Sequence, residues 1–135
     1  MTNKLIIFSD GGARGNPGKA AIGVVIYDAN GKKIKQISKT IGETTNNQAE
    51  YQALIAGLGQ AVDLGASEVV CNLDSELVVR QMQGQYKVRE ETLKDLAVQA
   101  LRLTAKFKRV QFLHIPREKN KLADKLVNQA LDATE

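Results

Sequence analysis

The chain has 135 residues, of which 43% are hydrophobic and 25% are charged, a balance that excludes an intrinsically disordered protein and suits one folded domain over residues 1–135. Lys and Arg outnumber Asp and Glu by 19 to 15, and the resulting net charge of +4 is compatible with a polyanionic partner. Cys71 is the one cysteine, which excludes an intramolecular disulfide framework. Because the sequence shows no signal peptide and no long apolar span, we expect a cytoplasmic protein. A monomer is the default expectation.

Three strands are predicted in the first third of the chain. The apolar run at Lys4–Ser9 predicts a central strand buried on both faces, and the Val- and Ile-rich run at Ala20–Tyr27 predicts a second. Asn30-Gly31 is a strong hairpin signal, so Lys32–Ile41 is expected to be the antiparallel partner of the second strand. The isoleucines of this third segment do not alternate regularly, for which a bulge, an exposed edge or a wrong assignment are the alternatives.

The rest of the chain alternates helices with two further strands. Capping residues at Glu43–Asn47 precede a helix with a stripe of small and aliphatic residues, which ends at Gly65. The further elements are a strand at Val69–Leu73, a helix from Ser75 to about Gln83, a helix at Glu90–Phe107, a strand at Val110–Ile115 and a last helix capped by Asn120. The order β-β-β-α-β-α-α-β-α predicts one α/β domain with a mixed sheet.

A glycine-rich segment, Ser9–Gly18, follows the first strand. It places the carboxylate of Asp10 where we expect the buried strand to end and a loop to begin, and its glycines leave room for another molecule close to the backbone. Taken alone, an Asp-Gly-Gly sequence after a strand is usually a turn. Its significance depends on which other side chains the fold brings to the same place.

Three further acidic residues are candidates to meet Asp10. Connections of a strand, a helix and a strand are normally right-handed, so the first, fourth and fifth strands are expected to run parallel. Asp10 and Asp74 then lie at the same edge of the sheet, where α/β proteins place their sites. Glu50 lies in the first turns of its helix, and Asp124 holds a matching position in the last helix.

Each of these acids also has a purely structural explanation. Acidic residues near a helix start complement the helix dipole, and Asp74 would cap the helix that follows it. Four converging carboxylates would repel one another and raise each other's pKa, so such a convergence is expected chiefly around a divalent metal ion. Ligation by carboxylate oxygens alone favours Mg²⁺ or Mn²⁺ over zinc.

The sequence resembles type 1 ribonuclease H, a family of enzymes that cut the RNA strand of RNA–DNA hybrids. The resemblance covers nearly the whole chain and rests on motifs in the family's order and spacing, which are Ser9-Asp10-Gly11-Gly12 with Gly15-Asn16-Pro17-Gly18, Thr44-Thr45-Asn46-Asn47-Gln48-Ala49-Glu50, Asp74-Ser75 and Asn120-Lys121-Leu122-Ala123-Asp124. It implies a ribonuclease H-like fold with a mixed five-stranded sheet flanked by helices, and an endoribonuclease whose products carry 5′-phosphate and 3′-hydroxyl ends.

The resemblance also implies roles for individual residues. The matches to the family's catalytic acids, which bind two Mg²⁺ or Mn²⁺ ions, are Asp10, Glu50, Asp74 and Asp124, with Asp10 expected to bridge both ions. The matches to positions that hold sugar and phosphate groups of the hybrid are Asn16, Thr45, Asn46 and Asn47. The backbone at Gly11 and Gly12 would lie beside a 2′-hydroxyl, which distinguishes RNA from DNA, and a side chain there would crowd that approach.

The sequence departs from the family pattern in a region that binds nucleic acid in relatives. Many relatives carry a basic protrusion with an additional helix and tryptophans, whereas only one helix is predicted over residues 84–110 and the chain has no Trp. Basic residues here are candidates to supply part of the missing phosphate contact, or else to form an ordinary solvated face; they are Lys87, Arg89, Lys106, Lys108 and Arg109.

A second departure concerns the histidine that aids turnover in the family, in the loop before the last helix. The one histidine, His114, has the family's separation from Asp124, but the strand pattern places it at the end of a strand instead of in the loop. If the loop is shortened, Arg117 occupies the turnover position, and we favour Arg117 over His114.

The sequence therefore predicts a metal-dependent endoribonuclease that hydrolyses the RNA strand of RNA–DNA hybrids by a two-metal-ion mechanism. One alternative is a module of the same fold that binds hybrid or RNA without catalysis, and another is a nuclease that also acts on double-stranded RNA. No required protein partner is evident.

Overall fold

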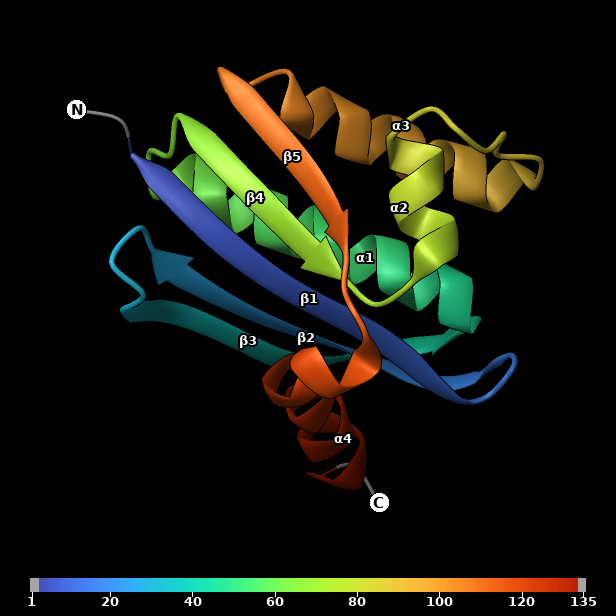
Figure 1. Cartoon of the computed structure of the whole chain (residues 1–135). Helices are drawn as coiled ribbons and strands as arrows, with labels where there is room; N and C mark the ends of the chain where they lie inside the picture. Colours follow the sequence, from blue (N-terminus) through green and yellow to red (C-terminus); the bar gives the residue numbers. More distant parts are fainter. Residues whose placement is uncertain (1–2, 134–135) are drawn as a thin grey trace.

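The computed structural model describes residues 3–133 and has a five-stranded mixed sheet at its centre (Figure 1). The strands are β1 (Lys4–Gly15), β2 (Gly18–Asp28), β3 (Lys33–Thr44), β4 (Glu68–Leu73) and β5 (Arg109–His114), in the spatial order β3-β2-β1-β4-β5. β1, β4 and β5 run parallel, whereas β2 is antiparallel to both β1 and β3. The predicted mixed sheet and its parallel part are confirmed.

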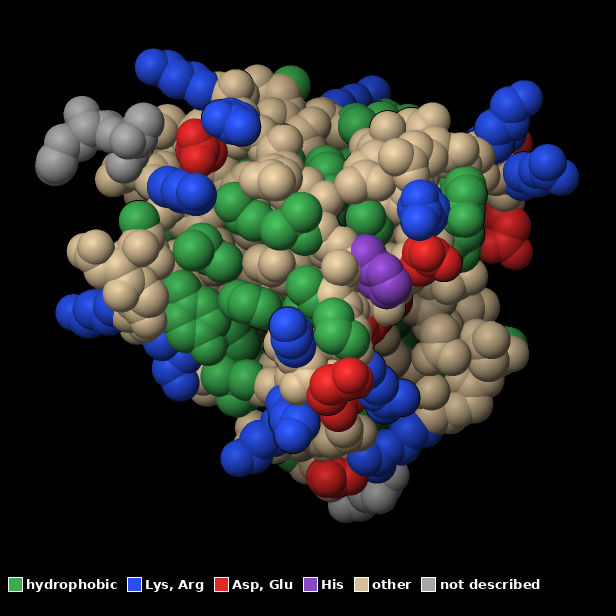
Figure 2. Space-filling view, viewed as in Figure 1, with side chains coloured by type: hydrophobic (Ala, Val, Ile, Leu, Met, Phe, Trp, Pro, Cys, Tyr) green, Lys and Arg blue, Asp and Glu red, His purple; other side chains and the backbone are tan. Residues whose placement is uncertain are grey.

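The helices cover the two faces of the sheet unequally (Figure 1). The larger core lies beneath α1 (Asn46–Asp63), α2 (Glu76–Met82) and α3 (Glu91–Thr104), and α4 (Lys121–Ala133) packs on the opposite face. α4 leaves part of that face open, and hydrophobic side chains gather on the surface beside it (Figure 2). The predicted element order is confirmed, with one addition, a short 3₁₀ helix η1 (Arg117–Lys119) before α4.

Close packing of α1 on the sheet explains the small residues of its buried stripe. A Cβ atom built on Gly57 would lie 2.9 Å from Ile7 Cγ2, so the helix approaches β1 more closely than a larger residue would allow. Cys71 is buried in the same core, and burial raises the pKa of its thiol to about 12. Cys71 is therefore a buried thiol of the core.

The glycine-rich segment is a strand and not the predicted loop. β1 continues through Gly15 because its antiparallel pairing with β2 extends to Gly15 and Gly18. Its parallel pairing with β4 ends at Ser9 and Leu73, so Asp10 is the first residue of β1 beyond the end of β4. The sequence thus placed Asp10 correctly at the end of the parallel pairing, but the end of the strand itself was wrong.

The other boundaries differ from the predictions by a few residues. Asp28 Oδ1 accepts hydrogen bonds of 2.9 Å from both Asn30 N and Lys32 N, which extends the predicted hairpin turn and delays β3 to Lys33. β3 is an edge strand, and its register against β2 shifts twice. Both the exposed edge and the bulge that were offered as explanations for its irregular isoleucines therefore apply. The only helix within residues 84–110 is α3, which confirms the compact form.

The predicted helix ends are mostly found. Thr45 and Ser75 are side-chain N-caps of α1 and α2, and Gly65 and Gly84 follow these helices with positive φ angles of 79° and 77°. α3 ends three residues before the predicted Phe107, because the chain turns there with Phe107 N donating to Thr104 O. Within residues 3–133, none of the helices has the length and apolar composition needed to cross a membrane.

Candidate active site

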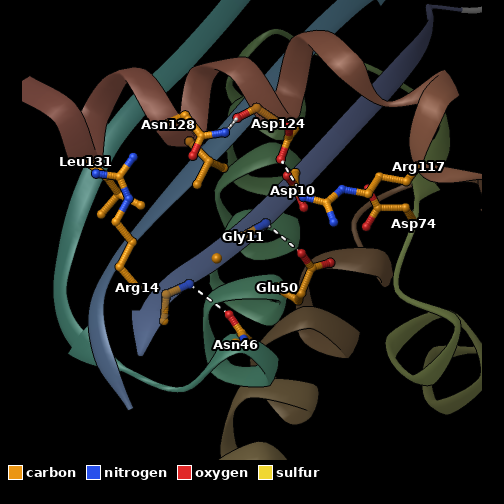
Figure 3. A pocket seen from close by; sticks show the side chains of 13 residues that line it. Asp10, Gly11, Arg14, Asn46, Glu50, Asp74, Arg117, Asp124, Asn128 and Leu131 are labelled. Atoms are coloured by element: carbon orange, nitrogen blue, oxygen red, sulfur yellow. Dashed lines mark hydrogen bonds and ion pairs between the residues drawn. The ribbon is translucent and has the colours of Figure 1, made fainter. Parts of the chain in front are cut away.

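A cavity of about 450 Å³ lies where β1 runs past the end of β4, between α1 and α4 (Figure 3). Its lining includes all four acidic residues that were predicted to converge. It also includes two arginines, Arg14 and Arg117. The lining residues are Asp10, Gly11, Gly12, Ala13, Arg14, Asn46, Glu50, Asp74, Arg117, Asp124, Val127, Asn128 and Leu131.

Each acid reaches the cavity from a different element. Asp10 on β1 and Glu50 on α1 are each 7% exposed, and one carboxylate oxygen from each of Asp10, Glu50 and Asp74 lies within 4.8 Å of the others. Asp124 approaches from α4 on the opposite side, close enough to Asp10 to interact with it directly (Figure 3). The structure therefore brings together four residues that are up to 114 positions apart in the sequence.

A backbone hydrogen bond orients the carboxylate of Glu50. Gly11 N donates to Glu50 Oε1 at 2.7 Å, while Glu50 Oε2 is buried and has no hydrogen-bond partner in residues 3–133. Burial of an unpartnered carboxylate oxygen is costly, so a cation is the expected partner of Oε2. The all-carboxylate donor set fits Mg²⁺ or Mn²⁺, and the residues present are suited to hold such an ion.

The electrostatics of the site agree with this assignment. Burial, together with the charges of Asp74 and Asp124, raises the pKa of Asp10 from 3.8 to about 6, although the adjacent Glu50 side chain acts in the opposite direction. Burial and the neighbouring Asp10 raise the pKa of Glu50 well above its ordinary value. Without a metal ion, the site therefore favours the neutral, protonated forms of Asp10 and Glu50. A bound divalent cation would favour their charged forms.

We expect the metal-free protein to lose stability as the pH rises from about 4 to about 7. Asp10 has a higher pKa in the folded than in the unfolded chain, so the folded state binds more protons in this window and the free energy of unfolding falls, by up to about 3 kcal/mol from Asp10 alone. Thermal unfolding in EDTA across this range measures the change, and millimolar Mg²⁺ should reduce it.

The Asp10→Asn variant is the control for this pH dependence, because it removes the titrating group. A wild-type stability that is flat or rises through this window in EDTA, and that matches the variant, would contradict the raised pKa of Asp10.

Asn120 has a different role from the predicted helix cap. Its carbonyl begins α4 by accepting from Asp124 N at 3.1 Å, but its side chain turns inward. Asn120 Nδ2 donates to Ser9 O at 2.9 Å and to Asp74 Oδ2 at 3.2 Å, and the residue is 1% exposed. Asn120 therefore positions the carboxylate of Asp74. The sequence did not predict this role, because an asparagine at the start of a helix fits a helix cap as well as an inward contact.

The two candidates for the turnover residue lie in different surroundings. Arg117 belongs to η1, lines the cavity, and places Nη2 3.6 Å from Asp124 Oδ1. His114 is the last residue of β5; it is exposed and does not line this cavity. Of the two side chains, the structure brings only that of Arg117 to the four acids.

Two asparagines predicted to contact substrate join the β1–β2 hairpin to α1. Asn46 Oδ1 accepts from Ala13 N at 2.8 Å, and Asn46 N donates to Asn16 Oδ1 at 3.0 Å. Thr45 caps α1, and Asn47 is exposed in its first turn. Of these four predicted residues, only Asn46 lines the cavity.

The structure shows a packing reason for one of the two glycines, while their predicted approach to a 2′-hydroxyl stays a prediction. A Cβ atom on Gly11 would lie 2.2 Å from the carbonyl carbon and oxygen of Ala49, so Gly11 is required by the packing of α1 on β1. A Cβ atom on Gly12 would make an ordinary contact of 3.5 Å with Val127 Cγ1. Gly12 lines the cavity and leaves space there, whereas the absence of a side chain at Gly11 has a structural cause.

Two further polar residues of the cavity had no predicted role. Asn128 follows Asp124 by one helical turn and donates from Nδ2 to Asp124 O at 3.2 Å, so helical periodicity could have identified it. Arg14 lies within the glycine-rich segment, but Asp132, one of its partners, is 118 positions away, and no local signal connects the two.

Comparison with known proteins agrees with the fold and the site. A family model described as reverse transcriptase-like matches residues 8–130. LC11-RNase H1, isolated from compost by a metagenomic approach, is 51% identical and superposes with a TM-score of 0.91 over 98% of this chain and 99% of its own. The chain belongs to the type 1 ribonuclease H family. This family membership accounts for the order and spacing of the acidic motifs along the sequence.

Further ribonuclease H proteins share this similarity. The RNase H1 of Halobacterium salinarum is 40% identical, with a TM-score of 0.94 over 96% of this chain and 98% of its own. A bifunctional protein of Mycobacterium tuberculosis is 48% identical over 131 residues, which are 96% of this chain. The chain spans only 36% of the length of that mycobacterial relative.

Proposed function

We propose that this protein is a metal-dependent endoribonuclease that hydrolyses the RNA strand of RNA–DNA hybrids. The observation that carries the proposal is the convergence of Asp10, Glu50, Asp74 and Asp124 on one cavity, with Glu50 Oε2 buried and without a hydrogen-bond partner in the described chain. The substrate is supported by LC11-RNase H1, 50% identical to this chain, whose crystal structure contains an RNA/DNA hybrid.

The four acids are the proposed metal ligands. Two divalent ions held there would supply the positive charge needed for an in-line phosphoryl displacement by water. Gly11 N fixes one oxygen of Glu50 and Asn120 Nδ2 fixes one oxygen of Asp74, and the second oxygen of each carboxylate would be available to hold an ion. These two hydrogen bonds come from rigid parts of the fold, so the acids are positioned before substrate binds.

Arg117 supplies a positive charge on the open side of the acids. Its side chain is 80% exposed and its only described ion pair is the 3.6 Å contact with Asp124, so the guanidinium is free to reorient toward a phosphate. In this position it would hold the phosphate group that leaves with the product and thereby assist turnover.

Cleavage assays on matched duplexes test the proposed function. The wild type is expected to cut an RNA–DNA hybrid in Mg²⁺ or Mn²⁺, to lose activity in EDTA, and to leave DNA duplex of the same sequence intact. Hybrid binding without cleavage in either ion would contradict the enzyme and identify a binding module of the same fold. Equal cleavage of double-stranded RNA would instead extend the substrate range.

We expect Arg117→Ala to lower kcat on hybrids by about 3- to 30-fold, less than the 10²–10³-fold typical of a buried charge-stabilising donor, because the side chain is exposed. His114→Ala, made as the matched change at the competing position, is expected to retain kcat within about twofold, in the range of a surface substitution. Steady-state kinetics with both variants measure the difference, and the reverse order would assign turnover to His114.

A further inference from the structure

The cavity carries a second arginine, at the opposite end from Arg117. The side chain of Arg14 extends from the end of β1 along the cavity to the part of α4 that contains Leu131, far from the four acids (Figure 3). Among the residues that line the cavity, Arg14 and Arg117 are the two with positive charge, against four carboxylates. A phosphodiester strand entering this cavity would therefore have two protein cations to meet.

Arg14 is held in place by the elements on both sides of the cavity. The backbone beside it is joined to α1 through Asn46 Oδ1, which accepts from Ala13 N. Its guanidinium reaches α4, where Arg14 Nη2 lies 2.6 Å from Asp132 Oδ1. Both partners of this ion pair are solvent-accessible, with side chains 37% and 66% exposed. Exposed ion pairs contribute little to stability, so the exchange of Asp132 for another anion has a low cost.

The two ion pairs of the cavity are spaced along one helix. Arg117 pairs with Asp124 and Arg14 with Asp132, two turns farther along α4. The eight residues from Asp124 to Asp132 correspond to about 12 Å along the helix axis. At about 3.4 Å per nucleotide along a duplex axis, a duplex lying along α4 would place roughly three to four nucleotides of one strand in this separation.

We propose that Arg14 binds a backbone phosphate of the substrate strand about three to four nucleotides from the bond that is cut, releasing Asp132 when it does so. The proposal rests on the proposed function, because it takes the strand in the cavity to be the RNA of a hybrid. A guanidinium offers paired donors that match a phosphate as well as they match a carboxylate. Asp132 thus holds the guanidinium in an extended conformation until a phosphate replaces it.

The experiment measures hybrid binding instead of cleavage, in the Asp10→Asn background at fixed Mg²⁺, by fluorescence anisotropy across a range of salt concentrations. Arg14→Gln is expected to raise Kd about 3- to 10-fold at low salt and to lower the slope of log K against log salt by about one. Asp132→Asn, which removes the charge of one competing anion, is expected to lower Kd by about twofold. The matched control is Arg102→Gln on α3, an exposed arginine outside the cavity.

Hybrids with a single neutral methylphosphonate locate the contact. A neutral linkage three or four nucleotides to one side of the cut site should weaken hybrid binding by the protein that keeps Arg14. The same linkage should not weaken hybrid binding by the Arg14→Gln variant any further. If Arg14→Gln binds hybrid with unchanged Kd and unchanged salt slope, while circular dichroism shows a folded protein, the role of Arg14 is wrong and the proposed function stands. If hybrid is bound neither by the protein that keeps Arg14 nor by the Arg14→Gln variant, both the role of Arg14 and the proposed function are wrong.

Discussion

Replacing Asp10 by asparagine is expected to lower hybrid cleavage by at least about 10²–10³-fold, the largest effect on activity of any single change considered for this chain. Asp10 is the buried acid that lies between the other three, since its surroundings include Glu50, Asp74 and Asp124. An asparagine at this position keeps the size of the side chain but removes the charge that would hold the ions. Single-turnover cleavage of a labelled hybrid in Mg²⁺ measures the loss.

The same change is expected to stabilise the metal-free protein near pH 8. Asp10 is forced to ionise above its raised pKa of about 6 among other carboxylates, and the neutral amide avoids this repulsion. An exposed acid on α3 provides the control, since Asp95→Asn should alter neither cleavage nor stability by a measurable amount. An Asp10→Asn protein that retains most of its cleavage rate would show that the charge of Asp10 is not needed for the chemistry.

Replacing Gly11 by alanine is expected to be the most destabilising single substitution near the site. The new Cβ atom would lie 2.2 Å from the Ala49 carbonyl and 2.5 Å from Glu50 N, and these backbone atoms can move only if α1 moves. We expect a loss of about 4 kcal/mol or more in the free energy of unfolding, or failure to fold, out of a total of about 5–15 kcal/mol. Urea unfolding at 25 °C and the soluble yield measure it.

Gly12→Ala is the matched control, because it adds the same methyl group to the next residue of the strand. Its Cβ atom would make an ordinary 3.5 Å contact with Val127 Cγ1, so stability should stay within about 1 kcal/mol of the wild type. Because Gly12 lines the cavity, cleavage by this folded variant tests whether the space there serves the substrate. Equal destabilisation of the two variants would contradict the role of α1 packing at Gly11.

The acidic site could be predicted from the sequence because it depends on features that are local or topological. Asp10 and Asp74 follow apolar runs, and right-handed crossovers place the ends of parallel strands at one edge. The helix positions of Glu50 and Asp124 follow from capping residues and apolar periodicity. These signals determine which element carries each acid and at which end.

The remaining parts of the site depend on side-chain directions that the sequence does not specify. Asn120 occupies a helix-cap position, and only its inward rotamer connects it to Asp74. Arg117 reaches the acids because η1 turns the chain before α4, and a single 3₁₀ turn has too few residues for a periodic pattern. Metal preference, cytoplasmic location, the monomeric state and the extent of the domain stay predictions.

The early end of β4 has a consequence for the free edge of the central strand. Beyond Ser9, β1 has no neighbouring strand on that side within the described chain, and such an edge is a template for pairing with other polypeptides. Side chains of α1 occupy it instead, since Glu50 accepts from Gly11 N and Asn46 accepts from Ala13 N. Glu50 therefore combines a place in the acidic site with protection of the sheet against aggregation, and its substitution would affect solubility as well as chemistry.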